Sequence, residues 1–237
     1  IKKEIMSKKP SKGGAPALDM TPMVDLAFLL VTFFMLTASF RMAEPVTVDP
    51  PSSIGNVALP DNHILVTIDP NGRIYFGISN TTAKVNALKE MSAKYKVDFN
   101  EKQSAKFGGI PSFGVDIKDL PAYIDAKDEE RKNFKGINKN GQSGVPMDTI
   151  TPNNQLKDWI AIGGREAVRV YNEAKAEATA SGQDFKAEKP RYAIKCDSKT
   201  KYIFVKNVVK TFTDLKIFQF NLITSLEGGG TVIEPTK

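Results

Sequence analysis

The chain is poor in the residues that most often carry metal-binding and redox chemistry. Its 237 residues include a single cysteine, Cys196, and a single histidine, His63. One cysteine excludes a disulfide framework within these residues and fixes no redox compartment. One histidine can build neither a histidine-based metal site nor, unaided, a common acid–base pair. We therefore expect Cys196 to be an inert strand residue and His63 to lie at the surface where a strand begins.

Catalytic motifs are also missing. There is no nucleophile elbow, no zinc signature and no paired-carboxylate motif. Three glycines at 228–230 are not followed by Lys and Ser or Thr, which a phosphate-binding loop requires. The acidic residues between 116 and 130 are interrupted by lysines and lack the spacing of a calcium-binding hand. The sequence therefore predicts no enzyme and no cofactor or metal.

The charge pattern gives no sign of nucleic-acid binding. The net charge is +6, but lysines are mixed with acids in stretches such as 94–98 and 128–132. That mixture is typical of solvated faces, and no recognition motif accompanies it. We expect no nucleic-acid partner. With 41% hydrophobic and 25% charged residues, the composition suits one or two globular units.

One long apolar run stands out, and it contains a carboxylate. The nineteen residues from 22 to 40 carry Asp25 as their only charge. At a rise of ~1.5 Å per residue, a helix of this length can cross a hydrocarbon layer of ~30 Å. Thr21 is a suitable capping residue and Pro22 suits the first helical position. The sequence predicts a transmembrane helix over 20–40.

The basic residues around this run predict its direction. Five lysines precede it, whereas Arg41 is the only base in the twenty residues that follow. The positive-inside rule then places the N-terminus in the cytoplasm and the rest of the chain outside. A cleaved signal peptide is the alternative, since Thr37-Ala38-Ser39 loosely resembles a cleavage site. Pro22, Asp25 and the length of the run argue against cleavage.

Asp25 needs a reason to be in the apolar run, because a central aspartate costs roughly 2.5 to 3.5 kcal/mol on insertion scales. At ~100° per residue, further polar and apolar side chains fall on the same helical face. Such a face should meet partner helices or a water-filled cleft. Proton transfer and simple hydrogen bonding in a homodimer are equally compatible with the pattern. The predicted face comprises Asp25 with Thr21, Leu29, Thr32, Leu36 and Ser39.

The residues around Asp25 resemble a known family. Residues 18–30, LDMTPMVDLAFLL, and 33–37, FFMLT, are similar to the ExbD/TolR family of biopolymer-transport proteins. The shared pattern is a Thr-Pro or similar pair, two apolar residues, the membrane aspartate, a leucine-rich stretch and Phe-Met. The resemblance implies that Asp25 carries protons, the coupling ion, without a cofactor. Thr32 is then the natural second member of a path lined by the predicted face.

The resemblance also implies a fold class, a single N-terminal transmembrane helix followed by a small α+β periplasmic domain with a mixed sheet. Alternation over 64–68, a DPNG turn and residues 73–76 predict a β-hairpin. The final elements are a strand over 191–196, a helix capped at Asp197 or Ser198, and a strand over 218–226. The helix face is expected to comprise Tyr202, Val205, Val208, Val209, Phe212 and Leu215. Residues 194–227 are similar to the family's C-terminal strand-helix-strand.

The middle of the chain departs from the family pattern. Residues 79–188 are longer than the few elements expected there, and we interpret most of them as a helical insertion. The patterns predict helices over 83–95 and 120–134, glycine-containing loops at 108–114 and 138–145, and a long helix over 152–181 that carries Trp159. The predicted domains are a cytoplasmic segment 1–19, the helix 20–40, a mobile proline-rich linker 41–62, the periplasmic domain 63–227 and a flexible tail 228–237.

Two functions follow. The resemblance implies a motor subunit of the bacterial inner membrane, a homodimer inside an ExbB-like ring, that uses the proton-motive force to energise a TonB-like protein for outer-membrane import. A TolR-like role or a flagellar-stator relationship stays open. The alternative is a signal-anchored periplasmic binding or scaffolding module whose helix is only a tether in the lipid membrane. A tether tolerates any apolar residue at position 25, whereas a proton carrier tolerates only a titratable one.

Overall fold

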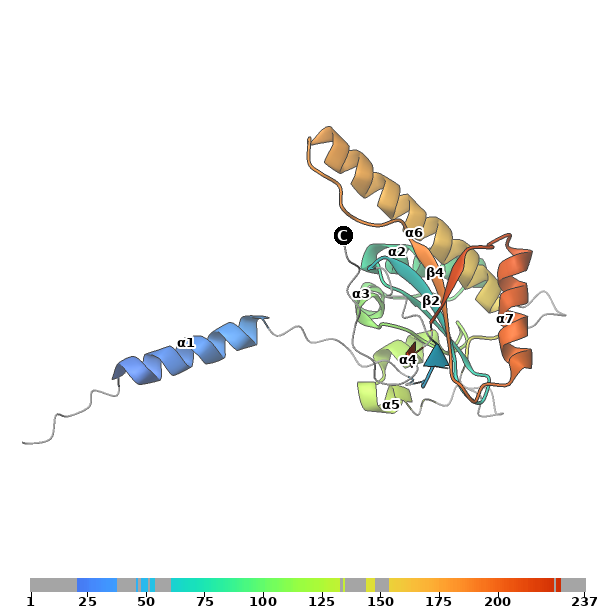
Figure 1. Cartoon of the computed structure of the whole chain (residues 1–237), viewed down its shortest axis with the longest axis horizontal. Coiled ribbons are helices and arrows are strands. Elements are labelled where there is room, and N and C mark those ends of the chain that lie inside the picture. The colour runs from blue at the N-terminus through green and yellow to red at the C-terminus, as the bar shows by residue number, and fades with distance from the viewer. Residues whose placement is uncertain are drawn as a thin grey trace, which may run out of the picture. The chain divides into compact units, whose positions relative to one another are not determined.

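The computed structural model divides the chain into two compact units, Ile1–Arg41 and Met42–Lys237, and each is described by itself. The first contains the helix α1 (Thr21–Thr37) and the second contains every other element (Figure 1). The predicted segments 1–19 and 228–237 lie outside the described residues. The structure describes residues 21–37, 46, 48–50, 52–53, 61–132, 134, 144–147, 154–223 and 225–226.

The second unit is built on a four-stranded mixed sheet with the strand order β3-β2-β4-β5. β2 and β3 form the predicted antiparallel hairpin, in which Ile64 pairs with Ile78 and Ile68 with Ile74. β2 and β4 are parallel, as are β4 and β5. The predicted mixed α+β architecture is therefore confirmed. The strands are β2 (His63–Ile68), β3 (Ile74–Ile78), β4 (Arg191–Cys196) and β5 (Phe220–Ile223).

The hairpin turn is fixed by a buried aspartate. The carboxylate of Asp69 accepts hydrogen bonds from the backbone N–H groups of Asn71 at 2.9 Å and Arg73 at 2.8 Å, and it also pairs with the Arg73 guanidinium. The Asp69 carbonyl accepts a hydrogen bond from Thr200 Oγ1 at 3.1 Å. Gly72 completes the turn with a φ of +79°, a left-handed conformation that favours glycine. The turn is thus tied to the chain just before the C-terminal helix.

Two long helices cover one face of the sheet, α2 (Thr81–Tyr95) and α6 (Gln155–Ala180). Asn80 caps α2 by accepting a hydrogen bond from Ala83 N at 2.9 Å, and Asn154 caps α6 in the same way. α6 approaches the sheet closely at Gly164, where a Cβ atom would lie 1.9 Å from Tyr192 Oη. The C-terminal half of α6 extends past the sheet (Figure 1) and is largely exposed.

The hydrophobic core centres on Trp159 of α6, which is fully buried. Its ring lies 4.9 Å from that of Phe113, 5.9 Å from Phe76 and 6.2 Å from Phe107, measured between centroids. Offset and edge-to-face pairs at these separations are favourable beyond the area they bury. The core therefore joins the hairpin to the helices of the predicted insertion, so that the insertion is an integral part of this unit.

Of the three helices predicted in the middle of the chain, the first and the last are confirmed and the one between them is corrected. α2 and α6 match the helices predicted over 83–95 and 152–181. The helix predicted over 120–134 is instead two short helices, α4 (Leu120–Asp125) and α5 (Asp128–Lys132), because Ala126 adopts an extended conformation. Gly108 and Gly109 do not lie in a loop: they end the helix α3 (Glu101–Gly109), which the prediction missed. Of the loop predicted over 138–145, only residues 144 and 145 are described.

The C-terminal helix, α7 (Tyr202–Asp214), differs from its prediction at its start. Neither Asp197 nor Ser198 caps it, because the helix begins four residues later, after Lys201. Val208 and Phe212 lie on its buried face as predicted, but Tyr202 is 76% exposed. The strand predicted over 218–226 is also shorter, since β5 spans only Phe220–Ile223 and a separate strand, β6, spans Ser225–Leu226.

Part of the predicted linker is bound to the domain. Val48 is buried, and Asp49 N donates a hydrogen bond to Asp197 Oδ2 at 2.9 Å while Ser198 N donates to Asp49 O at 2.8 Å. The strand β1 (Ser52–Ser53) pairs in parallel with β6. The backbone N–H groups of Lys199 and Asp49 hold the pKa of the Asp197 carboxyl below its usual range. At its described positions, the linker is therefore docked rather than mobile.

Candidate functional site

The helix α1 carries the predicted site residue Asp25. Asp25 is the only charged side chain among the seventeen residues of α1, and it is exposed. The large apolar side chains of α1 are exposed as well, with Leu36 at 87%. Apolar surface exposed along a whole helix marks contact with lipid or with partner helices. Asp25 is therefore the one carboxylate of α1, and no other described helix of this unit packs against α1.

The structure supports the helical placement of four of the predicted face residues. Because α1 is continuous from Thr21 to Thr37, Asp25, Leu29, Thr32 and Leu36 fall within about 60° of arc. Thr32 Oγ1 donates a hydrogen bond to the Leu29 carbonyl at 2.9 Å. Asp25 and Thr32 are about 10 Å apart along the axis, so they share a face without touching. Thr21 begins α1 but its side chain is not described, and Ser39 lies outside the described residues.

Of the predicted span 20–40, the structure describes Thr21–Thr37 as helix, and residues 20 and 38–40 lie outside the described residues. Within the described ranges, no helix has both the length and the apolar character needed to cross a membrane.

The comparison with protein families bears on the pattern around Asp25. The model of the biopolymer transport protein ExbD/TolR family matches residues 11–129, half of the chain. The chain belongs to the ExbD/TolR family. The resemblance found in the sequence is therefore confirmed. ExbD/TolR proteins are inner-membrane, non-enzymatic accessory proteins of transport, and this membership indicates a role in energy transduction for biopolymer transport.

The ExbD/TolR match covers a defined part of the fold. It spans α1, the hairpin, α2, α3 and α4, and ends within α5. It therefore runs through residues 79–129, the first part of the predicted insertion. The C-terminal strand-helix-strand, which resembled the family in sequence, lies beyond the match. No curated protein and no solved structure matches the chain.

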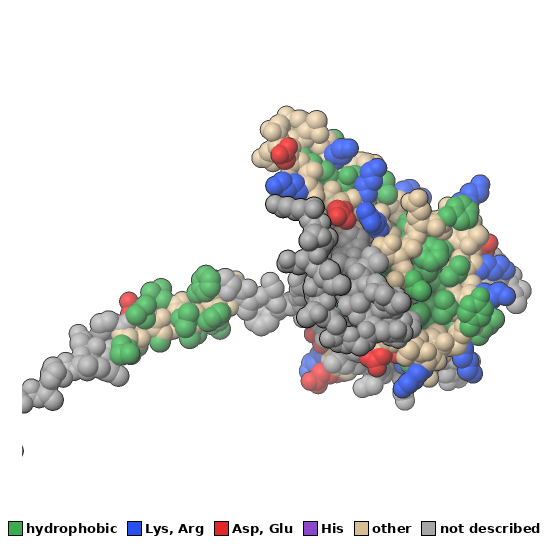
Figure 2. All heavy atoms as spheres, viewed as in Figure 1, with side chains coloured by type: hydrophobic (Ala, Val, Ile, Leu, Met, Phe, Trp, Pro, Cys, Tyr) green, Lys and Arg blue, Asp and Glu red, His purple; other side chains and the backbone are tan. Residues whose placement is uncertain are grey.

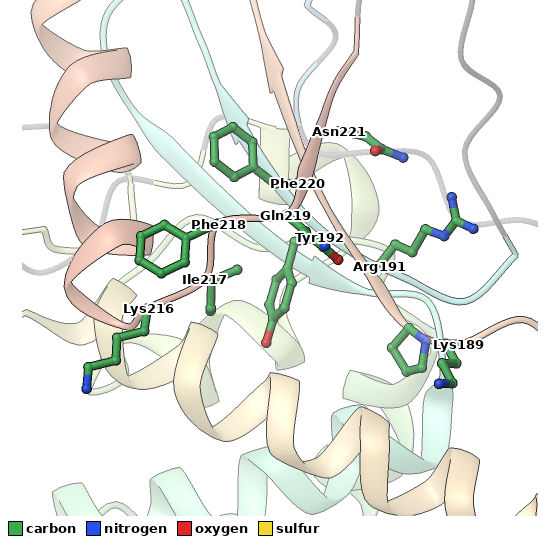
Figure 3. A pocket seen from close by; sticks show the side chains of 10 residues that line it. Lys189, Arg191, Tyr192, Lys216, Ile217, Phe218, Gln219, Phe220 and Asn221 are labelled. Carbon is green, nitrogen blue, oxygen red and sulfur yellow. The ribbon is translucent and has the colours of Figure 1, made fainter.

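The domain has an open pocket of about 970 Å³ where β4 and β5 begin (Figure 3). Three exposed cationic side chains, Lys189, Arg191 and Lys216, line it together with aromatic rings and two amides. Figure 3 shows Tyr192 directed toward the helix below it, and Arg191 and Asn221 on the other side of the strands. This pocket could not be found from the sequence, because its residues come from two segments more than twenty positions apart.

The remaining predictions about reactive residues concern His63 and Cys196. His63 is the first residue of β2 and is partly exposed, and Cys196 is a buried residue of β4, both as expected. Burial raises the pKa of the Cys196 thiol, which disfavours the reactive thiolate. In the described parts of the chain, no group of three or more His, Cys, Asp or Glu side chains could hold a metal ion.

Acid–base pairs connect α2 and α6 rather than forming a reactive site. Tyr95 Oη donates a hydrogen bond to Asp158 Oδ2 at 2.7 Å, and Lys94 Nζ lies 2.6 Å from Asp158 Oδ1. Within α6, Arg169 Nη2 lies 2.6 Å from Glu166 Oε2. This guanidinium holds the pKa of the buried Glu166 carboxyl below its usual range. Asp158 and Glu166 each have a cationic partner, so these contacts account structurally for the two charges.

Lys84 is a buried lysine with no carboxylate partner among the described residues. Its Nζ donates hydrogen bonds to the carbonyls of Ile110 at 2.6 Å and Gly108 at 3.2 Å. These carbonyls lie at the C-terminal end of α3, where the helix dipole favours a cation. Burial nevertheless lowers the pKa of Lys84 to about 8. The ammonium therefore caps a helix at the cost of its own hydration.

Lys84 should make the stability of the domain vary with pH in the alkaline range. Its pKa is about 8 in the folded state and 10.5 ordinarily, so between these values the unfolded chain binds more protons. The contribution of Lys84 to the free energy of unfolding should therefore rise with pH, by about 2 kcal/mol from pH 8 to pH 10. Urea unfolding of the wild type and of Lys84→Met across this range measures the difference. Parallel pH profiles for the two proteins would contradict the prediction.

Proposed function

We propose that the chain is a proton-motive-force-driven subunit of a biopolymer transport system and that Asp25 is its proton carrier. The supporting observation is the coincidence of ExbD/TolR membership with a single carboxylate on an otherwise apolar helix. A lone ionisable group in a membrane helix marks an ion or proton pathway by default. Thr32, on the same face and two turns further, extends the polar path. The other lining residues are Thr21, Leu29, Leu36 and Ser39.

The helix needs partners for this role. One helix with one carboxylate cannot enclose a path, because polar groups facing lipid would stay unsatisfied. An ExbB-like ring would supply the surrounding helices, with a dimer of this subunit inside it. α1 would cross the inner membrane with its N-terminus in the cytoplasm, and the sheet domain would lie in the periplasm. Protons are the coupling ion in this scheme, and no cofactor takes part.

Movement of α1 would reach the domain through the linker. The described contacts of the linker with the domain involve Val48, the Asp49–Asp197 hydrogen bond and the β1–β6 pair. A displacement of α1 would therefore act first at these contacts. The domain would pass the work to a TonB-like protein that spans the periplasm and energises outer-membrane import.

Proton flux in reconstituted vesicles tests this proposal. The full chain is co-expressed with an ExbB-like ring protein, purified as a complex and placed in vesicles with an imposed pH gradient. We expect the complex to dissipate the gradient faster than the ring protein alone or the chain alone, because only together do they enclose Asp25. The measurement is repeated with a TonB-like partner bound to the complex. A stable complex that leaves the gradient intact in the presence of this partner would count against the proposal.

A further inference from the structure

The outward face of α7 combines apolar side chains with lysines. Tyr202 is 76% exposed and Ile203 is 52% exposed, and both lie in the first turn of the helix. Lys206 and Lys210 are exposed one and two turns further. At ~100° per residue these four side chains fall within about 100° of arc, opposite the buried Val208 and Phe212. We call these four residues, with Lys199 and Lys201 just before the helix, the α7 face.

Few acids accompany the lysines of this region, although Lys199 interacts electrostatically with the nearby Asp197. Residues 199–216 contain five lysines and one acid, Asp214, a net charge of +4 in a chain whose total is +6. All five lysines are exposed, and none takes part in the ion pairs formed among the described residues. Figure 2 shows apolar side chains gathered over α7 and β5 with Lys and Arg side chains around them. Charge complementarity therefore favours an anionic occupant with an apolar component.

The length of the linker limits how far the domain can lie from α1. Ten residues, 38–47, separate the end of α1 from the docked Val48, so the two positions can lie at most ~40 Å apart. Asp49 is hydrogen-bonded to Ser198, four residues before Tyr202. The linker thus meets the domain four residues before the first turn of α7 along the chain. If α1 is anchored in a bilayer, the α7 face can reach the surface of that bilayer.

We propose that the α7 face binds the anionic surface of the membrane in which α1 is anchored. Tyr202 and Ile203 would enter the headgroup region, where tyrosine is favoured, and the lysines would contact acidic phospholipid headgroups. Lysines near an anionic surface each strengthen binding by about fivefold. The proposal rests on the membrane anchoring in the proposed function. A protein partner with an acidic surface is less favoured. Such a partner could bind α7 wherever the linker meets the domain, whereas docking on the anchoring membrane depends on the linker meeting the domain close to α7.

A tryptophan at position 202 reports the docking. The full chain with Tyr202→Trp is placed in lipid nanodiscs whose acyl chains carry bromine, a fluorescence quencher. One set contains phosphatidylglycerol and the other only phosphatidylcholine. The native Trp159 is fully buried and serves as the unquenched reference. Ala105→Trp, on the exposed side of α3, is the matched probe away from the α7 face. We expect strong quenching at position 202 only with phosphatidylglycerol, and none at position 105.

Charge reversal identifies the lysines as the cause. Lys206→Glu with Lys210→Glu should lower the docking constant by at least about 25-fold, fivefold for each lysine lost. Lys102→Glu with Lys106→Glu places the same two changes at the same spacing on α3 and should leave docking unchanged.

The contrary outcomes are distinct. Equal quenching at position 202 in both lipids, equal quenching at positions 202 and 105, or no quenching at all in loaded discs would overturn membrane docking. Protection of position 202 only after an acidic partner protein is added would also overturn it, and would make the face a protein interface. A chain that fails to enter the discs, judged by flotation, would overturn the anchoring itself and with it the proposed function.

Discussion

Asp25→Asn should abolish growth that depends on outer-membrane import, while leaving the amount of the chain and its membrane partners unchanged. Asparagine keeps the size of aspartate and its capacity for hydrogen bonds, but it cannot take up and release a proton. If Asp25 only holds helices together, the amide can replace it, because interhelical hydrogen bonds do not require a charge. If Asp25 carries protons, the complex should assemble and do no work. Growth on a substrate imported by a TonB-type system, with a pull-down of partners alongside, measures both quantities.

Two further substitutions separate the roles. Asp25→Glu retains a titratable group one methylene further from the helix and should keep part of the growth, because reduced positioning lowers but does not remove proton transfer. If α1 is only a tether, Asp25→Leu should be tolerated best, since it removes the free-energy cost of inserting the carboxylate into the membrane. Normal growth with Asp25→Leu or Asp25→Asn would make α1 an anchor and would direct attention to the domain. Loss of partners in the Asn variant would instead show that Asp25 acts in assembly.

Local patterns predicted the elements whose signals are local. The hairpin follows from alternation and the turn at 69–72, and α6 from a long periodic stretch. α3 was missed although its signal was present, because the glycines at 108 and 109 were taken as a break. Asn100 and Gln103 form a capping box there, and that pattern marks a helix start. The glycines end the helix rather than preventing it.

Contacts between distant segments were beyond sequence reasoning. Asp197 was predicted to cap a helix because acidic residues favour that position. Its carboxylate instead binds the backbone of Asp49, 148 positions away. Helical spacing predicts Tyr202 on the buried face, but it lies at the edge of that face, in the first turn, and is 76% exposed. The charge pattern does not single out the lysines of 199–216, and their common exposure along α7 is visible only in the fold.

Gly72→Ala should destabilise the domain by about 3 kcal/mol. Gly72 has a φ of +79°, and a left-handed alanine costs roughly 1 to 2 kcal/mol. The added Cβ would also lie 2.6 Å from the ring of Phe204 in α7, an overlap that something must move to relieve. Overpacking of this kind costs roughly 1 to 3 kcal/mol. For a unit of this size the melting temperature should fall by on the order of 10 °C.

The two contributions can be measured separately, because the chain offers a matched glycine. Gly182 has a φ of +67° and no atom within 4 Å of an added Cβ, so Gly182→Ala should show the backbone cost alone. Combining Gly72→Ala with Phe204→Leu removes the planar ring and should recover part of the loss, which a double-mutant cycle measures. Thermal unfolding of the full chain in detergent, followed by the fluorescence of buried Trp159, gives each value. If Gly72→Ala and Gly182→Ala proved equally costly, the close contact between the hairpin turn and α7 would carry no energetic weight, and the turn would be held by Asp69 alone.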